Sequence, residues 1–317
     1  MVLTQYVVDF NQSVQQPDLQ DRRKTVDKMA NIKRICAPSM RGQLQFDEIG
    51  YWSEIKLEIQ KEYAAAYSTI LAAQKNPSLH HVYIDAFAGS GIHLTKVAQE
   101  FVLGSPLNAL RVQPPFREYH LVDIRPEKVE SLKALIGPRK DVIVYQGDCN
   151  KILLDTIFPR VKYKDYRRGL CILDPYGLDL NWTVIYNAGQ MKTLDIFLNF
   201  PVADMNRNVL WRNPANVEDT QKERMNSFWG DDSWHGAAYR TDLNFFNEPE
   251  KQSNEDIAEA FRKRLKEVAR FARVPKPVPM RNSRGAIVYY LFFASQKDTA
   301  EHIVLDIFKK YENRGAR

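Results

Sequence analysis

Three aspartates stand at the ends of strand-like segments, and the first is followed by a loop of small residues. An apolar run with β-branched residues reaches Asp85 and then breaks into a loop that contains Gly89 and Gly91. This pattern is typical of a buried parallel strand that leads through a tight turn into a helix. Asp123 and Asp148 end two later strand-like runs. Glycine lets a ligand approach the main chain and a carboxylate accepts hydrogen bonds, so these residues predict a ligand-binding edge.

The glycine loop departs from the dinucleotide-binding pattern G-x-G-x-x-G, because Leu94 stands where the third glycine is expected. Instead, the stretch Asp-x-Phe-x-Gly-x-Gly resembles motif I of class I methyltransferases that depend on S-adenosylmethionine (SAM). The resemblance implies that the cofactor contacts this segment, at Asp85, Phe87, Ala88, Gly89 and Gly91. An ordinary glycine loop between a strand and a turn is the alternative.

The acids after the next two strands fit the same ligand. Asp123 matches the carboxylate that binds both ribose hydroxyls of an adenosyl group, and two charge-assisted hydrogen bonds of about 1.5–3 kcal/mol each would make it a main anchor. Asp148, with its neighbour Cys149, is expected at the adenine amino group. Aspartate is common in turns, so each acid alone says little. Three acids at successive strand ends, one beside a glycine loop, together predict a SAM site.

A fourth strand ends in the turn Asp174-Pro175-Tyr176. Proline fixes φ and removes a donor, so the turn is expected to project Asp174 and Tyr176 rigidly toward the ligand. It resembles motif IV of amino-methyltransferases, Asp/Asn-Pro-Pro-aromatic, which binds the target amine and stacks on a base. Here the second proline is missing and the aromatic residue comes one place early, which favours cofactor proximity over base methylation. We expect Asp174 to accept a hydrogen bond from the methyl acceptor; a simple strand-ending turn is the alternative.

The elements that must position these residues follow an alternating order. A helix over 51–74, with Ser53 as its N-cap, precedes strands and helices in turn. Such alternation predicts a Rossmann-like α/β fold of the class I methyltransferase type, with a doubly wound, mostly parallel sheet. A basic helix is expected over 255–273. The expected strands are 82–87, 118–123, 141–146, 169–174, 194–200 and, after the basic helix, 286–295.

The core pattern is interrupted by a polar stretch rich in tryptophan, with Trp229 and Trp234 among its aromatic residues. A long aromatic excursion after a central strand predicts a lid or substrate-binding insertion, in which these two indoles contact the substrate. We therefore expect four parts: an N-terminal extension at 1–50, a SAM-binding core at 51–200, an insertion at 201–285, and the last strand and helix of the core at 286–317.

Positive charge is concentrated in one segment. Residues 261–285 hold nine Lys or Arg against a single acid, Glu267, in a chain of net charge +6. A stripe of this kind predicts a footprint for nucleic-acid phosphates, and a solvated helix face is the alternative. The predicted contacts are Arg262, Lys263, Arg264, Lys266, Arg270 and Arg273.

The composition predicts a soluble globular protein, with 44% hydrophobic and 26% charged residues among 317. No window approaches the roughly 20 apolar residues that span a bilayer, and the N-terminus lacks a signal-peptide pattern, so a cytoplasmic location is expected. Cys36, Cys149 and Cys171 show no C-x-x-C spacing, which argues against disulfides and zinc. Cys171 is expected to be a core residue, and no metal site is predicted.

Several segments, in order, resemble the three-Cys-motif partner (TcmP) proteins, from about residue 51 to the end of the chain. This resemblance implies a SAM-binding Rossmann-like fold and a protein partner. The segments are Tyr51-Trp-Ser-Glu-Ile-Lys-Leu-Glu-Ile, Tyr83-Ile-Asp-Ala-Phe-Ala-Gly-Ser-Gly, Gly104-Ser-Pro, Leu173-Asp-Pro-Tyr-Gly, Arg224-Met-Asn-Ser-Phe-Trp-Gly and Tyr290-Leu-Phe-Phe-Ala-Ser.

The leading hypothesis is a SAM-dependent methyltransferase with in-line methyl transfer at the Asp174-Pro175-Tyr176 turn, for which nucleic acid is one candidate acceptor. The alternative is a methyltransferase-like module without catalysis that binds a protein partner or nucleic acid. A nicotinamide-dependent oxidoreductase is a third hypothesis, which Leu94 in the glycine pattern disfavours. The sequence leaves the methyl acceptor, the oligomeric state and the role of residues 1–50 open.

Overall fold

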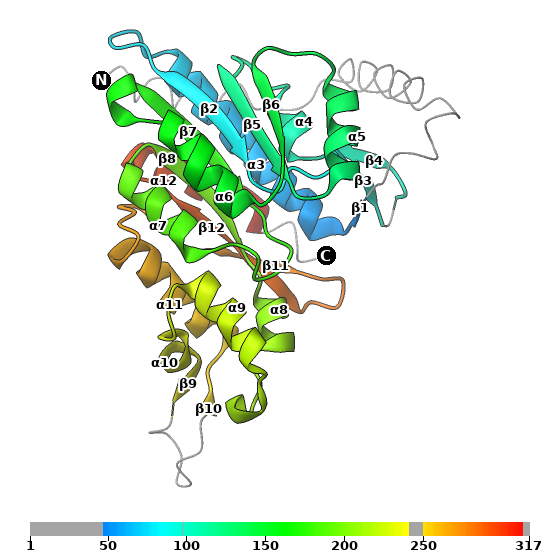
Figure 1. Cartoon of the computed structure of the whole chain (residues 1–317), viewed down its shortest axis with the longest axis vertical. Helices are drawn as coiled ribbons and strands as arrows, with labels where there is room; N and C mark the ends of the chain where they lie inside the picture. The colour runs from blue at the N-terminus through cyan, green and yellow to red at the C-terminus, as the bar shows by residue number, and fades with distance from the viewer. Residues whose placement is uncertain (1–46, 97, 241–249, 313–317) are drawn as a thin grey trace. The chain divides into compact units, whose positions relative to one another are not determined.

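A seven-stranded sheet forms the centre of this computed structural model, which describes residues 47–96, 98–240 and 250–312 (Figure 1). Most of the predicted extension at 1–50 lies outside the described residues. The strand order is β11-β12-β8-β7-β2-β5-β6. The strands of this sheet are β2 His80–Asp85, β5 Glu118–Asp123, β6 Val142–Gln146, β7 Arg167–Leu173, β8 Leu194–Phe200, β11 Val278–Arg281 and β12 Ile287–Ala294.

Neighbouring strands from β6 through β8 pair in parallel, whereas β12 pairs antiparallel with both β8 and β11. If the seven strands are numbered along the chain, the order is 3-2-1-4-5-7-6. This is the Rossmann order 3-2-1-4-5-6 with one antiparallel strand inserted before the last. The predicted fold class is therefore confirmed as a Rossmann-like, doubly wound and mostly parallel sheet.

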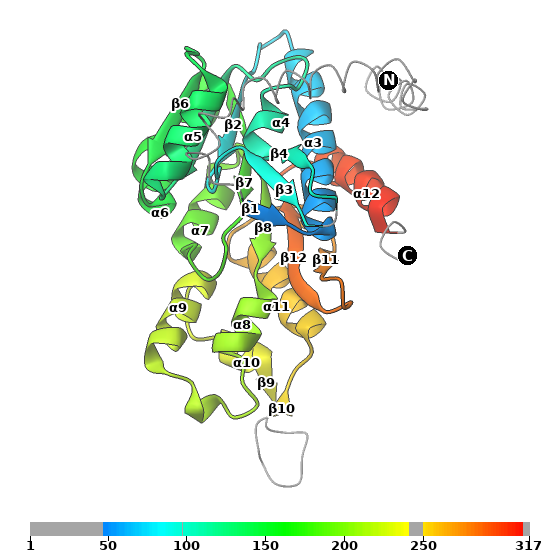
Figure 2. The same cartoon turned by 90° about the vertical axis from the view of Figure 1, so that its right-hand side faces the viewer.

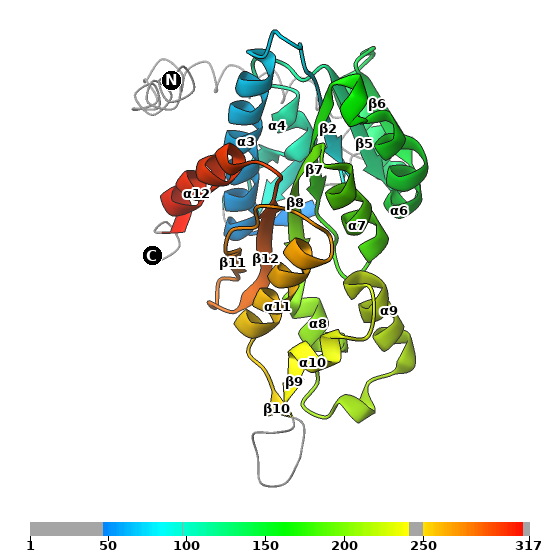
Figure 3. The same cartoon turned by 90° about the vertical axis from the view of Figure 1, so that its left-hand side faces the viewer.

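Helices cover both faces of the sheet, which is why its strands are apolar on both sides. Val82 and Ile84 point into one buried cluster with helix α7, and Tyr83 points into the other with α3, α4, α5 and α12. Figure 3 shows α3 and α12 on one side of the sheet and α6 and α7 on the other. These helices are α3 Tyr51–Ala72, α4 Ser105–Ala109, α5 Pro126–Ile136, α6 Cys149–Ile152, α7 Trp182–Met191 and α12 Asp298–Glu312. Cys171 is fully buried among the core residues, as predicted.

Two helix boundaries differ from the prediction. Helix α3 begins at Tyr51 with Gly50 as its N-cap, so Ser53 lies inside the first turn and is not the cap. The basic helix, α11 Asn254–Glu267, ends earlier than residue 273. The chain cannot continue the helix there, because Arg270 adopts a left-handed φ of 69°.

The glycine loop does not lead directly into a helix, contrary to the prediction. After Gly91 the chain forms β3 Ile92–Thr95 and β4 Phe101–Leu103, and only then α4. The main-chain N–H of Gly104 donates to the carbonyl oxygen of Gly91 at 2.7 Å and closes the base of this hairpin. β1 Asp47–Ile49 pairs in parallel with β3, and Figure 2 shows the three strands side by side.

The segment expected as an insertion packs on the α7 side of the sheet. Phe228 and Phe261 contribute to the same buried cluster as Phe200 and Phe292 of the central strands. The segment therefore extends the core on this side. Its elements are α8 Val202–Asn208, η4 Pro214–Asn216, α9 Asp219–Trp229, α10 Trp234–Ala238, β9 Tyr239–Arg240 and β10 Glu250–Lys251, followed by α11.

None of the helices in the described ranges has the length and apolar character needed to cross a bilayer.

Close packing between α7 and the turn after α11 gives a stability test at Gly189. A Cβ at this position would overlap the carbonyl oxygen of Ala269, which is fixed main chain. We expect Gly189→Ala to lower the free energy of unfolding by about 2–3 kcal/mol, measured by urea denaturation. Gly236→Ala in α10 is the control, because its Cβ would meet no atom within 4 Å. It should be neutral or stabilise by about 0.5–1 kcal/mol; equal losses in both variants would contradict the packing argument.

Candidate cofactor and acceptor site

The carboxyl ends of β2, β5, β6, β7 and β8 meet at one edge of the sheet. Strand order reverses between β2 and β7, because the chain builds outward from β2 to β6 on one side and from β7 to β8 on the other. In open α/β sheets, ligands bind beyond the carboxyl ends of the strands at such a reversal. Asp85, Asp123 and Asp174 all stand at this edge, as predicted.

The glycine loop and the end of β5 are joined by a direct contact. The main-chain N–H of Gly89 donates to Asp123 Oδ2 at 2.8 Å, and the N–H of Arg125 donates to Oδ1 at 2.9 Å. A carboxylate has about four acceptor positions, so two remain for further donors such as ribose hydroxyls. Gly89 has a φ of +63°, and no atom lies within 4 Å of where its Cβ would stand. Space is thus free beside the loop at Gly89 among the described residues, and binding of an adenosyl group there stays a prediction.

The second glycine of the loop has a packing role. Gly91 has a φ of +85°, and a Cβ there would come within 2.8 Å of Leu132 Cδ1 in α5 and 3.2 Å of Leu107 Cγ in α4. Ala88 is also buried, with its N–H donating to the carbonyl oxygen of Val122 at 2.8 Å. Both residues hold the loop against neighbouring elements, and direct cofactor contact at either stays a prediction.

Asp85 is completely buried at the end of β2. It accepts hydrogen bonds from the hydroxyl of Tyr83 at 3.2 Å and from the N–H of Phe87 at 3.3 Å. Burial raises its pKa to about 6, although hydrogen bonds from Ser105 and Phe87 act in the opposite direction. Asp85 therefore supports the loop from beneath and is poised to change its charge near neutral pH.

The end of β6 takes a local structural role. Asp148 is the N-cap of α6, with its Oδ1 accepting from both the main-chain N–H and the side-chain amide of Asn150 at 2.9 Å. The Cys149 thiol is buried, and burial raises its pKa to about 12, so it is neutral and packs in the core. Contact of Asp148 and Cys149 with adenine stays a prediction.

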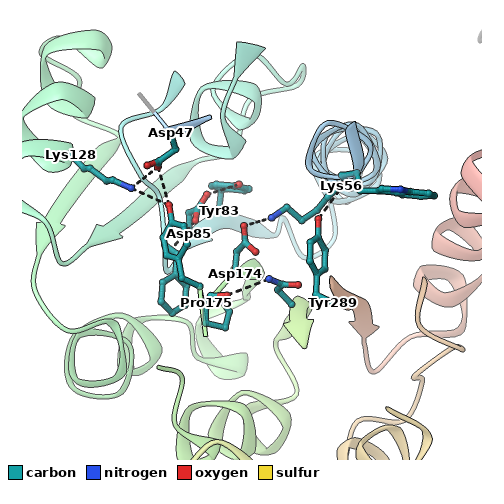
Figure 4. Close-up of polar contacts among 12 residues, drawn as sticks. Asp47, Lys56, Tyr83, Asp85, Lys128, Asp174, Pro175 and Tyr289 are labelled. Atoms are coloured by element: carbon teal, nitrogen blue, oxygen red, sulfur yellow. Dashed lines mark hydrogen bonds and ion pairs between the residues drawn. The ribbon is translucent and has the colours of Figure 1, made fainter. Parts of the chain in front are cut away.

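Asp174 forms an ion pair with Lys56 of helix α3, and Figure 4 shows the two side chains pointing at one another. The Lys56 residue is only 8% exposed. Burial lowers the pKa of its ammonium, but Asp174, Tyr289 and Tyr176 together raise it, so the net pKa lies above the ordinary value. The next residue, Pro175, offers its carbonyl oxygen to the side-chain amide of Asn199 at 3.3 Å. The turn is thereby fixed to both α3 and β8.

Tyr176 is held by a second polar cluster. Its hydroxyl donates to Asp47 Oδ2 at 2.9 Å and accepts from Lys128 Nζ at 3.0 Å, while Lys128 Nζ lies 2.5 Å from Asp47 Oδ2. The ammonium also lies 5.1 Å from the centre of the Tyr176 ring. Because the hydroxyl is anchored and the residue is 68% exposed, the ring is presented to solvent in a fixed orientation.

Sequence reasoning missed four polar residues of this edge, Lys56, Asp47, Lys128 and Asn199. Lys56 carried a usable signal, because it lies beside Ile55 and one turn before Ile59 on the apolar face of its helix. A lysine there must pair or reach water. Asp47 and Lys128 carried no signal, because their contact joins β1 to α5 across 81 positions of the chain.

The structure corrects the prediction for two tryptophans. Trp229 and Trp234 are 2% and 1% exposed and belong to the hydrophobic core. Their indole N–H groups donate inside the protein, to Ser233 Oγ at 3.0 Å and to Asn226 Oδ1 at 2.6 Å. In this arrangement they pack beneath the surface and do not offer a ring face to a substrate.

The basic stripe is divided by intramolecular contacts. Arg262 pairs with Glu259, Arg264 with Asp231, and Arg273 with Asp298 and Glu301. Arg264 also lies over the Trp182 ring at 4.7 Å. The remaining predicted contacts, all exposed, are Lys263, Lys266 and Arg270. The structure therefore gives less support to a continuous phosphate-binding surface along 261–285 than the sequence did.

No protein-family model and no curated protein matches the chain. Solved structures with a related arrangement include a Legionella pneumophila protein, 12% identical with a TM-score of 0.40, covering 82% of this chain and 93% of that one. A candidate methyltransferase from Thermobifida fusca is 14% identical, with a TM-score of 0.36 and coverage of 76% and 82%. A SAM-dependent methyltransferase from Leishmania major is 8% identical, with a TM-score of 0.34 and coverage of 77% and 82%. Such distant similarity carries no argument about chemistry, so the fold class rests on the strand order above.

The buried carboxyl of Asp85 predicts a measurable pH dependence of stability. Its pKa is about 6 in the folded chain, against an ordinary 3.8. Between these values the folded chain keeps a proton that the unfolded chain has released, so stability falls as pH rises through this window. We expect Asp85→Asn to gain about 2–3 kcal/mol relative to the wild type between pH 4 and 7, in urea denaturation. Asp195, also raised to about 6, is present in both proteins and cancels; a pH-independent difference would contradict the assignment.

The ion pair at Asp174 predicts coupling between distant residues. Lys56→Met keeps the apolar stem but leaves a partly buried carboxylate unpaired, and we expect a loss of about 1–3 kcal/mol. Adding Asp174→Asn should recover part of this loss, giving a coupling energy of about 1 kcal/mol or more in a double-mutant cycle. Lys61→Met is the matched control, because its pair with Glu58 is half exposed and should be worth less than about 0.5 kcal/mol. Additive losses in the cycle would show that the pair is not an energetic unit.

Proposed function

We propose that this chain is a SAM-dependent methyltransferase. The observation that carries the proposal is the contact of the glycine loop with the acid of the neighbouring strand, Gly89 N–H to Asp123 Oδ2, at the point where the strand order reverses. In the proposed complex, the two free acceptor positions of Asp123 bind the ribose hydroxyls. Asp85 and Phe87 define the loop beneath the methionine part of the cofactor, and Asp148 lies toward the adenine.

SAM supplies an activated methyl group with its own leaving group, so the protein mainly has to orient the acceptor and exclude water. The proposed acceptor position is at the Asp174-Pro175-Tyr176 turn. Asp174 pairs with Lys56, and the carboxylate has further acceptor positions for a hydrogen bond from the methyl acceptor. The exposed ring of Tyr176, fixed by Lys128 and Asp47, forms the side of the acceptor position.

A specific observation also favours a second function, a methyltransferase-like module that binds without catalysis. Lys56 already occupies the carboxylate that would orient the acceptor, and the turn lacks the second proline of motif IV. The resemblance to the three-Cys-motif partner proteins supports a protein partner for such a module. Methyl transfer to mixed DNA, RNA and protein acceptors, measured with radiolabelled SAM, separates the two functions once cofactor binding is established.

Calorimetric titration with SAM tests the cofactor assignment. We expect wild-type protein to bind SAM and S-adenosylhomocysteine at one site. Asp123→Ala should weaken both by at least about tenfold, because two hydrogen bonds to a charged group are lost.

Asp219→Ala is the matched control for this titration, because Asp219 is exposed on α9, away from the glycine loop, and forms an ion pair with the neighbouring Lys222. It should bind like the wild type. Binding that survives Asp123→Ala unchanged would place the cofactor elsewhere. No binding to the wild type would reject the methyltransferase proposal.

A further inference from the structure

A groove lies near the amino ends of the central strands, away from the site described above. It has a volume of about 360 Å³ and is lined by apolar side chains together with one lysine, one tyrosine and one amide. The lining residues are Leu154, Phe158, Pro159, Val161, Lys162, Tyr163, Asn187 and Met191. They come from helix α7 and from the segment between α6 and β7, which forms η1 Leu153–Ile157, η2 Phe158–Arg160 and η3 Tyr163–Asp165.

The elements that line this groove carry exposed aromatic rings, of which Tyr163 belongs to the lining itself. Tyr163 is 59% exposed and Tyr166 is 52% exposed, and Tyr186 of α7 is exposed as well. The Arg168 guanidinium lies 4.0 Å from the centre of the Tyr163 ring, which already shows the ring engaged by a flat cationic partner.

The main chain that carries these rings is fixed. Tyr166 adopts a left-handed φ of 54°, and its carbonyl oxygen accepts from the N–H of His80 at 3.0 Å. The carbonyl oxygen of Val161 accepts from the hydroxyl of Thr193 at 2.9 Å. The segment is thereby tied to β2 and to the start of β8, so a ligand would meet an ordered surface and not a loop that must first be ordered.

Positive charge surrounds the same groove. Residues 159–168 hold five Lys or Arg against one acid, Asp165. Arg167 is neutralised by Glu118. Within the described part of the chain, no ion pair forms at the other exposed cations of the segment, namely Arg160, Lys162 and Lys164. In the stripe at 261–285 three arginines are paired internally, and Lys263, Lys266 and Arg270 remain exposed, so both regions have to be compared in the test.

We propose that this groove, with its tyrosines and its unpaired cations, binds single-stranded nucleic acid. Exposed rings stack on bases without regard to sequence, and unpaired cations follow the phosphate backbone; together they are the two parts of a single-strand binding surface. An acidic peptide would use the cations but would leave the exposed rings without a partner, so the observations favour nucleic acid.

The groove is separated from the proposed methyl-transfer site by the length of β7. Tyr166 directly precedes this strand and Asp174 directly follows it, so the two positions are roughly 20–25 Å apart. The proposal therefore stands whether or not the chain transfers methyl groups. If it does, the groove would bind a part of the nucleic acid that lies away from the methyl-transfer site.

The test is fluorescence anisotropy with the full chain and labelled oligo-dT or oligo-U of about 12 nucleotides, over a range of salt concentrations. We expect binding that weakens with salt. Lys162→Glu combined with Lys164→Glu should raise Kd by about tenfold or more and reduce the salt slope. Tyr163→Ala should raise Kd by about fivefold or more with the salt slope unchanged, because it removes stacking and not charge. Stronger binding of one oligonucleotide identifies DNA or RNA as the preferred strand.

The matched control is Lys263→Glu combined with Lys266→Glu on α11, which makes the same charge change within the stripe predicted from the sequence. It should leave Kd within about twofold of the wild-type value. A larger loss in the α11 variant than in the groove variant would overturn the proposal in favour of the stripe. No binding by the wild type, or preference for an oligo-glutamate competitor over the oligonucleotides, would also overturn it. Thermal unfolding of each variant checks that the fold is kept.

Discussion

The structure depends on one constraint: a parallel sheet buried on both faces leaves only its two edges available for polar chemistry. Val82, Tyr83 and Ile84 show this along one strand, because their side chains alternate between two hydrophobic clusters. Polar residues therefore gather where strands begin or end. The carboxyl edge collects aspartates, lysines and a glycine loop, and the amino edge near β7 collects tyrosines and cations. The proposed SAM site lies at the carboxyl edge, and the proposed nucleic-acid groove lies at the amino edge.

At the carboxyl edge, two ion pairs join residues from different elements. Lys56 of α3 meets Asp174 after β7, and Lys128 of α5 meets Asp47 of β1. Among the residues that the structure describes, Asp85 forms no ion pair; its buried carboxyl accepts from neutral donors, and burial raises its pKa. The paired residues of this edge are far apart in the sequence, so its geometry depends on the whole fold.

The sequence was informative where a pattern is local. The strand over 118–123 has the boundaries that its apolar alternation predicted, so Asp123 could be placed at its end beside the glycine loop. Long-range contacts could not be predicted in this way. Lys56 and Asp174 are 118 positions apart, and the buried ring of Trp229 packs against Phe261 of a later helix, α11. The short β3–β4 hairpin was missed because its two strands are brief and are stabilised by β1, which precedes them in the chain.

That hairpin has a consequence for how the fold can diversify. Its two ends are clamped by the bond from Gly104 to Gly91, and a Cβ at Gly104 would come within 3.1 Å of the Gly91 carbonyl oxygen. The chain path before Gly91 and after Gly104 is therefore independent of what lies between them. Loop-closure entropy changes slowly with length, so related chains can lengthen, shorten or replace this excursion at small energetic cost. Because β1 pairs with the hairpin's first strand, such an exchange would also replace the strand partner of β1, and with it the support that holds Asp47 beside Lys128 and Tyr176.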